Sequence, residues 1–238
     1  MLNYQAVLKK LLVVSTVCLL PYLVVAQSDG NYDYHREFIW GINKNTSGGL
    51  IGGFVFKWSK ALGDRQLRTI GWEMVNVKNP DEIKINTGFG QFIPYKTNYL
   101  YAFRVQYGRD HILFMKTPSK GVQINFNYAG GPTIGIIAPY YVDNGKDRFQ
   151  FVDGVDQQSI IGTGYPFQGL FKSTMTAGLN LKASLSFEMG AFKSNVTGFE
   201  VGTLVDMYPN EIELMTNGDR NAKFFPTLFI TIFYGKRR

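Results

Sequence analysis

The last segment of the chain, residues 224–238, constrains the fold more than any other. It reads FFPTLFITIFYGKRR, which is rich in β-branched and aromatic residues and has one helix former, Leu228, at its centre. In an extended strand, alternate side chains point to opposite faces, and here both faces are largely apolar. Such a strand at a chain end is shielded when it pairs with the first strand and closes a barrel. We therefore predict that residues 224–235 are the closing strand of a β-barrel.

Residues 1–26 have the layout of a secretory signal peptide. Lys9 and Lys10 precede an apolar run that ends in Val24-Val25-Ala26, a small residue at the expected cut. The run is interrupted by polar residues and a proline, and it is short for a spanning helix of about 20 residues. We expect residues 1–26 to be removed on export and residues 27–238 to form one domain.

Composition excludes several classes of protein. Cys18 is the only cysteine and lies in the predicted signal, so the mature chain would have no disulfide and no thiolate ligand. No basic run precedes the C-terminal Lys236, so we expect no nucleic-acid partner. After residue 26 no segment approaches the length of a spanning helix, which argues against a helical membrane protein but not a membrane barrel, whose apolar residues are diluted by alternation.

Eight segments show the spacing of β-strands. They are residues 36–43, 50–60, 66–77, 97–107, 122–139, 179–189, 196–207 and 224–235. The clearest is 179–189, in which apolar residues alternate strictly with polar ones. Gly130-Gly131-Pro132 predicts a bulge or bend within the fifth segment. Eight strands, mostly 8 to 14 residues long, predict an all-β fold: an antiparallel up-and-down barrel, near the roughly 9–11 residues of a tilted transmembrane strand.

The links between these strands alternate in length. The second, fourth and sixth are shorter, and the third, fifth and seventh are longer; the first is short and breaks the trend. Membrane barrels have short periplasmic turns and longer extracellular loops, so we predict that both termini are periplasmic. Residues 78–96 and 140–175 are long for simple connections, and long structured loops usually carry function.

The faces opposite the apolar ones carry charges of both signs. They hold Glu37, Lys57, Glu73, Arg104, Lys182, Glu188, Glu200 and Asp206. In a soluble lipocalin-like barrel this face would meet water. Aromatic residues near the predicted rims favour a transmembrane barrel instead, because aromatic girdles mark the two membrane interfaces. They are Tyr99, Tyr101, Tyr140 and Tyr208 at one rim and Trp58, Tyr107, Phe187 and Tyr234 at the other.

In the transmembrane interpretation the charged face lines the lumen. We then expect Lys182 to pair with Glu200, with Glu188 as a further partner. The lumen would be filled by bulky side chains, namely Lys57, Arg104, Lys182, Phe229 and Phe233. An eight-stranded barrel is just wide enough for its side chains to fill, so we predict a plugged lumen.

Short motifs near the end of the chain carry a resemblance. Residues 200–209 (EVGTLVDMYP), 234–237 (YGKR) and 107–109 (YGR), together with the aromatic last strand, resemble small outer-membrane β-barrel proteins of Gram-negative bacteria, OmpA- and OmpX-like in architecture. The resemblance covers most of the chain after residue 26. It implies an eight-stranded fold and an outer-membrane location, and it implies no reaction.

Candidate chemical sites are few. A barrel enzyme that acts on lipid acyl chains needs a His–Ser constellation near the outer leaflet, whereas His35 and His111 both fall at the predicted periplasmic end. Residues 143–147, with Asp153 and Asp156, offer oxygen ligands but lack the spacing of an EF-hand, so a solvated turn is the preferred interpretation. We therefore predict no catalytic residue, no cofactor and no metal site.

The predicted function is that of a structural or interaction module. We expect an accessory subunit of a larger envelope complex for protein insertion, secretion or uptake, in contact with outer-membrane lipid. Other envelope proteins would bind through residues 78–96, residues 140–175 and the periplasmic end, where Lys236-Arg237-Arg238 would meet lipid headgroups or a partner. The alternatives are a lipid-modifying enzyme of the acyltransferase or deacylase type and a small passive pore.

Overall fold

A computed structural model describes residues 35–46, 48, 52–115, 121–152, 154–165, 168–189, 195–216 and 221–238. They fall within one compact unit, Asp33–Arg238. The predicted signal peptide, residues 1–26, lies outside the described residues. No helix in the described part of the chain is long and apolar enough to cross a membrane.

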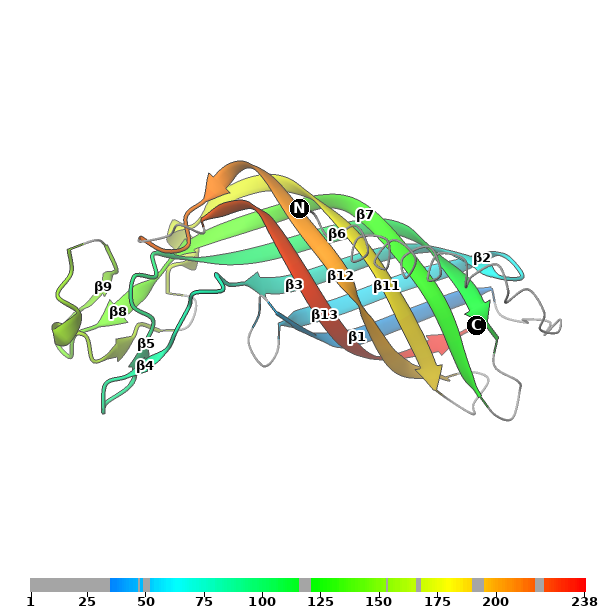
Figure 1. The fold of residues 1–238 in the computed structure, drawn as a ribbon, viewed down its shortest axis with the longest axis horizontal. Helices are drawn as coiled ribbons and strands as arrows, with labels where there is room; N and C mark the ends of the chain where they lie inside the picture. Colours follow the sequence, from blue (N-terminus) through cyan, green and yellow to red (C-terminus); the bar gives the residue numbers. More distant parts are fainter. Residues whose placement is uncertain are drawn as a thin grey trace, which may run out of the picture. The chain divides into compact units, whose positions relative to one another are not determined.

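Eight antiparallel strands close into a barrel (Figure 1). They are β1 (Arg36–Asn45), β2 (Gly53–Gly63), β3 (Gln66–Val77), β6 (Asn98–Phe114), β7 (Val122–Pro139), β11 (Thr174–Met189), β12 (Asn195–Ile212) and β13 (Ala222–Arg237). Each strand pairs with the next barrel strand along the chain, and β13 pairs with β1, so that Trp40 lies opposite Tyr234. The predicted eight-stranded up-and-down fold, closed by the last strand, is confirmed, as is the architecture that the resemblance implies.

The two faces of the barrel wall are the reverse of those of a soluble protein. Along β1 every second side chain is buried, and the buried set includes Glu37 and Asn43, whereas Phe38 and Trp40 are exposed. The same alternation continues round the barrel and leaves an exterior band of large apolar side chains. Because a soluble protein rarely exposes a continuous apolar surface of this extent, the band is the lipid-facing surface of a transmembrane barrel.

Several strand boundaries and one local feature differ from prediction. β6 continues past Tyr107 to Phe114, and β11 begins at Thr174, in a segment whose small and polar residues lack strong alternation. The bulge predicted at residues 130–132 is wrong, because β7 and β11 keep one register through this segment and the β6–β7 register shifts between Ile112 and Phe114 instead. Gly131 has another role: a side chain there would meet the backbone carbonyl of Val105 on β6.

The two ends of the barrel differ. At one end, which we call the terminus end, the β2–β3 turn is short and the described chain ends meet, since the amides of His35 and Arg36 both donate to the carbonyl of Arg238 at 2.9 Å. At the other end, the link end, residues 78–97 join β3 to β6 and residues 140–173 join β7 to β11. We call these two segments together the link unit.

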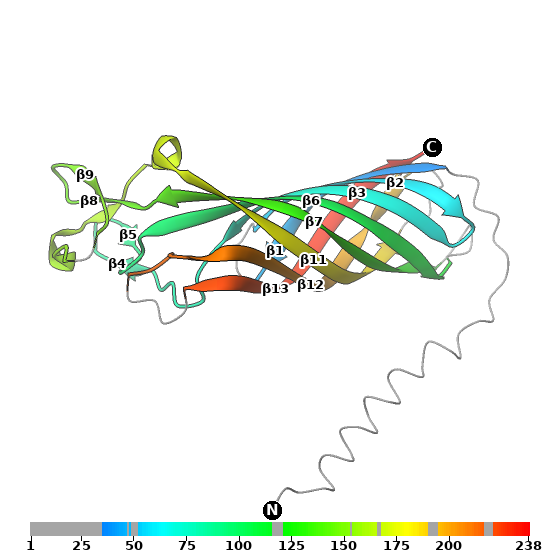
Figure 2. The same cartoon turned by 90° about the horizontal axis from the view of Figure 1, so that it is seen from above.

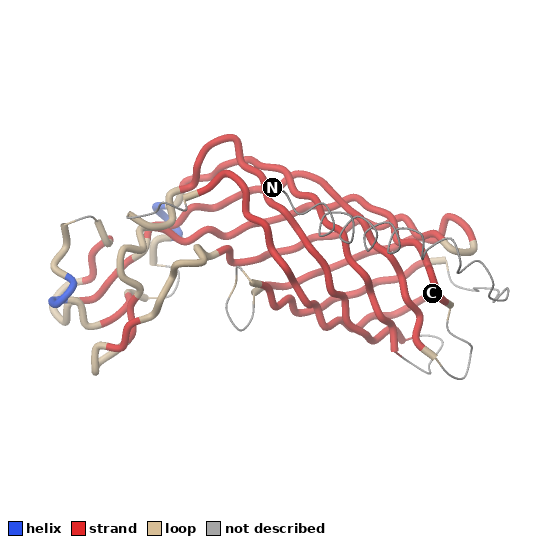
Figure 3. Tube along the Cα trace, in the orientation of Figure 1, coloured by secondary structure: helices blue, strands red, loops and turns tan. Residues whose placement is uncertain are grey.

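The link unit has secondary structure of its own. β8 (Tyr141–Asp143), β9 (Arg148–Gln150) and β10 (Gly162–Thr163) form a three-stranded sheet, and β4 (Ile85–Asn86) and β5 (Gln91–Phe92) form a hairpin. Figure 2 shows β8 and β9 continuing beyond the end of β7. The described helices are two short 3-10 turns, η2 (Gln157–Ser159) and η3 (Leu170–Lys172), both in the link unit (Figure 3).

Candidate functional site

Ion pairs cross the lumen at the middle of the barrel. Lys182 on β11 lies 2.7 Å from Glu73 on β3, although β6 and β7 separate these strands in the sheet. Arg104 on β6 lies 3.2 Å from the other carboxylate oxygen of Glu73 and bonds Asp206 on β12 through two nitrogens, with Nε at 2.9 Å. The network therefore joins opposite walls of the barrel. Strand alternation predicts which side chains face the lumen, but not which of them meet across it.

The predicted pair of Lys182 and Glu200 is present at 3.0 Å. Glu200 also accepts a hydrogen bond from Ser184 at 2.6 Å. The further partner proposed for Lys182 is wrong, because Glu188 forms its ion pair with Arg237. Arg237 also forms an ion pair with Glu37 at 2.6 Å. This second network therefore connects the closing strand β13 to β1 and β11 at the terminus end.

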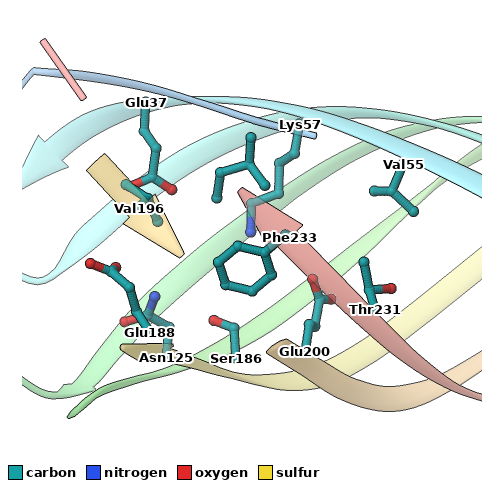
Figure 4. Close-up of a pocket in the computed structure, with 11 residues that line it drawn as sticks. Glu37, Val55, Lys57, Asn125, Ser186, Glu188, Val196, Glu200, Thr231 and Phe233 are labelled. Carbon is teal, nitrogen blue, oxygen red and sulfur yellow. The ribbon is translucent and has the colours of Figure 1, made fainter. Parts of the chain in front are cut away.

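The inward face is tightly filled. Two cavities within it have volumes of about 10 and about 20 Å³, room for about one water molecule each. Figure 4 shows the first of them, with Glu37, Lys57, Glu188 and Glu200 directed around the ring of Phe233. The bulky residues predicted for the lumen all lie there. Lys57 has a partner that the sequence did not suggest, Asp110 at 2.7 Å, because Asp110 was expected in a connection and lies in β6.

The link unit has an apolar core. It contains Phe92 and Ile93 from the first segment and Tyr140, Val142, Phe151 and Ile160 from the second. The Ile93 amide donates to the Tyr140 hydroxyl at 3.0 Å, and the Thr87 hydroxyl donates to the carbonyl of Ile161 at 2.5 Å. The two long links are therefore one packed body and not independent loops.

The β12–β13 connection is tied to the same body. The amides of Thr97 and Thr216 donate to the carbonyls of Leu214 and Tyr95, respectively, at 3.0 and 2.7 Å. A buried lysine lies here too: Lys96 is paired with Glu82 at 2.5 Å. Burial lowers the pKa of Lys96, and the carboxylate of Glu82 offsets part of that shift.

The aromatic girdle predicted for the link end is only partly present. Tyr140 and Tyr208 are buried, and they pack in the link unit and against Phe225 respectively, so they do not face lipid. Strand alternation predicts the direction of a side chain only within the barrel wall. Tyr140 lies just beyond the end of β7, so the prediction that it faces lipid was wrong. At the terminus end Trp58, Tyr107 and Tyr234 are exposed on the outer face, as predicted.

The outer surface of the link unit carries large exposed apolar side chains. Phe171 on η3 is 100% exposed and Phe89, next to β5, is 88% exposed. Each lies near a surface hollow. Phe89, Phe92 and Ile160 line a hollow of about 380 Å³, and a second of about 220 Å³ includes Tyr165 and Leu170 in its walls.

The described surroundings of His111 and of the acidic loop are those of a stacked side chain and a hydrogen-bonded turn. His111 lies near the terminus end of β6, stacked on Tyr128 with the ring centroids 5.6 Å apart. In residues 143–147, Asp143 accepts from the amide of Gly145 and pairs with Arg148, as expected of a solvated turn. Among the described residues, no three His, Cys, Asp or Glu side chains are grouped as metal ligands; Asp153 is outside those residues.

Comparison with known proteins gives remote structural likenesses. No protein-family model and no curated protein matches this sequence. The chain is similar to Ail, the attachment invasion locus protein of Yersinia pestis, at 9% identity over 86% of this chain and 99% of that one, with a TM-score of 0.39. It is also similar to Neisserial surface protein A, at 8% identity over 88% of this chain and 100% of that one, with a TM-score of 0.40. A third likeness is to the N-terminal β-barrel domain of Pseudomonas aeruginosa OprF, at 6% identity over 86% of this chain and 98% of that one, with a TM-score of 0.35.

Proposed function

We propose that this protein is an outer-membrane barrel of a Gram-negative cell and an accessory, non-enzymatic subunit of a larger envelope complex. The link unit would face the outside and bind another envelope protein, while the terminus end faces the periplasm. The complex would be one for protein insertion, secretion or uptake. The observation that carries the proposal is the pair of exposed aromatic side chains, Phe89 and Phe171, on a link unit that has its own core.

A single exposed apolar side chain is normal on any protein, but here several gather on one packed body. Ile83, Val152 and Tyr165 are also exposed on the link unit. Exposed apolar groups beside hollows are typical of protein interaction sites, and aromatic residues are enriched in them. Because the unit is held by its core and by backbone hydrogen bonds, binding would cost little ordering of the loops.

The filled lumen argues against the passive-pore alternative. Salt bridges join opposite walls at Glu73, Arg104 and Lys182, and the two cavities on the inward face each hold about one water molecule. We expect the purified protein in planar bilayers to show no steady open channel. Reproducible nanosiemens steps would contradict the plugged lumen.

Co-purification from native membranes tests the proposal. A tagged wild-type protein should retain a stoichiometric partner, and Phe89→Ser with Phe171→Ser should release it without lowering the amount of barrel in the membrane. Leu62→Ser is a matched control, since Leu62 is an exposed apolar side chain at the terminus end and should have no effect. A protein that purifies alone, together with altered lipid acyl chains after its deletion, would favour the enzyme alternative instead.

A further inference from the structure

Five basic residues from distant parts of the sequence form one row across the outside of the barrel. Arg36 lies directly opposite Lys60, Lys60 opposite Arg68, and Arg68 opposite Arg109. On the other side, Arg36 and Arg238 exchange both backbone hydrogen bonds, each at 2.9 Å. The row therefore runs over the neighbouring strands β13, β1, β2, β3 and β6 at the terminus end. With strands about 4.8 Å apart, it is about 20 Å wide.

The side chains of this basic row point away from the lumen. Arg36, Lys60, Arg68 and Arg238 are exposed, and Arg109 is half-buried. Each precedes or follows a buried, inward-facing residue such as Glu37, Ser59 or Thr69. Alternation along the strand therefore directs the row outward.

A second row, of apolar and mainly aromatic residues, lies two positions nearer the middle of β1, β2, β3 and β6, whereas the corresponding position on β13, opposite Phe38, is Lys236. Phe38 is opposite Trp58, Trp58 is opposite Ile70, and Ile70 is opposite Tyr107. Phe38, Trp58 and Tyr107 are exposed. On β1, β2, β3 and β6 the basic row therefore lies at the border of the apolar band, the level at which lipid headgroups begin.

This arrangement needs anions from outside the protein. Like charges directly opposite each other on neighbouring strands destabilise a sheet. Within the described chain none of the five residues forms an ion pair. The nearby carboxylates of Glu37 and Asp110 point inward and are paired with Arg237 and Lys57. The described chain therefore supplies no counter-charge to this row, and anions at the lipid side of the wall can supply it.

We infer that the basic row is a binding site for the phosphate groups of anionic phospholipids in the leaflet at the terminus end. Guanidinium groups hold phosphate through paired hydrogen bonds, and the aromatic row places the acyl chains beside them. A zwitterionic headgroup carries its own cation and would gain less. The inference is independent of the partner proposed for the link unit, and a soluble protein partner fits poorly because the row borders the lipid-facing band.

Lipid selectivity measured on the whole refolded barrel tests this. The protein is placed in phosphatidylcholine vesicles with traces of spin-labelled phosphatidylglycerol or spin-labelled phosphatidylcholine, and the fraction of immobilised label gives the relative association. Each surface cation contributes about fivefold at most to anion attraction, so we expect a several-fold preference for phosphatidylglycerol. In the triple variant Arg36→Gln, Lys60→Gln and Arg68→Gln, the ratio of phosphatidylglycerol to phosphatidylcholine association should fall close to one.

The matched control is Lys44→Gln with Lys146→Gln and Lys223→Gln, which removes the same charge from exposed positions elsewhere. It should keep the preference. Equal ratios for the two triple variants would overturn the inference, as would loss of the preference on adding inorganic phosphate, which would indicate a site for free phosphate. A stronger association with lipopolysaccharide than with phosphatidylglycerol would also overturn it. If the triple variant does not fold, by heat-modifiable gel mobility, the single Lys60→Gln variant must still lower the ratio.

Discussion

The inside of the barrel and the inside of the link unit are built on opposite principles. In the barrel, Glu73, Arg104 and Asp206 are buried, and large apolar side chains lie on the outside. In the link unit, Phe151 and Ile160 are buried as in any water-soluble protein. One chain therefore uses both patterns. The change begins on the wall strands near the link end, where Leu100, Ala102 and Phe225 form a buried apolar cluster.

The difference shows that the surrounding solvent decides which face of a strand is apolar. Lipid offers no penalty to an apolar exterior, so the polar residues of the barrel collect inside, where each charge needs a partner. Water drives apolar side chains inward, so the link unit depends on packing. The barrel should therefore be most sensitive to lost charges and the link unit to lost volume.

The largest effect should come from breaking the lumen network. Arg104→Met leaves Asp206 without its cation and Glu73 with only Lys182, and it should lower the free energy of unfolding by about 3–5 kcal/mol. Urea unfolding in detergent micelles measures this. The double variant Arg104→Met with Asp206→Leu should recover much of the loss, since Glu73 keeps Lys182. A single-variant loss below about 1 kcal/mol would mean that the network is not shielded from water.

The link unit should respond to a cavity instead. Phe151→Ala removes an aromatic ring from its core and should cost about 3 kcal/mol, within the usual range for such truncations. The expected readout is faster proteolysis within residues 78–97 and 140–173, with unchanged heat-modifiable mobility of the barrel. If the barrel itself became less stable to urea, the two regions would be one cooperative unit.

An arginine introduced at an exposed apolar position should cost much more stability where the side chain faces lipid than where it faces water. Leu181 on β11 is 59% exposed, and Leu181→Arg should cost roughly 2–4 kcal/mol near the bilayer midplane. Phe171→Arg on the link unit should change stability by no more than about 0.5 kcal/mol, because Phe171 faces water. Folding into vesicles followed by urea titration compares them. Equal costs at the two positions would contradict the assignment of the two solvents.

The smallest expected effect is one of pH. Burial raises the pKa of Tyr140 to about 12, so the folded link unit favours the neutral phenol. A pKa raised by folding gives stability that is complete below the ordinary value near 10 and is lost as pH rises toward 12. Proteolysis of the link unit should therefore quicken between pH 10 and 12 more in wild type than in Tyr140→Phe. An equal pH response in both would show that Tyr140 is not the group responsible.

Local alternation was enough to predict the eight strands and the direction of most wall residues; Tyr208 on β12, expected to face lipid, is an exception. Leu181 and Lys182 face opposite sides because neighbours in a strand must. Partners across the lumen were not predictable in the same way: the pair of Glu188 and Arg237 depends on how strands far apart in the sequence are registered. The basic row from Arg36 to Arg109 was missed for the same reason. The link-unit core was missed because its short strands lack periodicity.

The three tryptophans of the chain offer the most direct test of the inside-out barrel. Trp40, Trp58 and Trp72 all lie on the outer face and are exposed. In vesicles, phospholipids brominated on their acyl chains should quench most of the tryptophan fluorescence, whereas aqueous iodide should quench little. A barrel with its apolar face inward would place these rings in its core, away from lipid. Fluorescence unaffected by brominated lipid would therefore contradict the account.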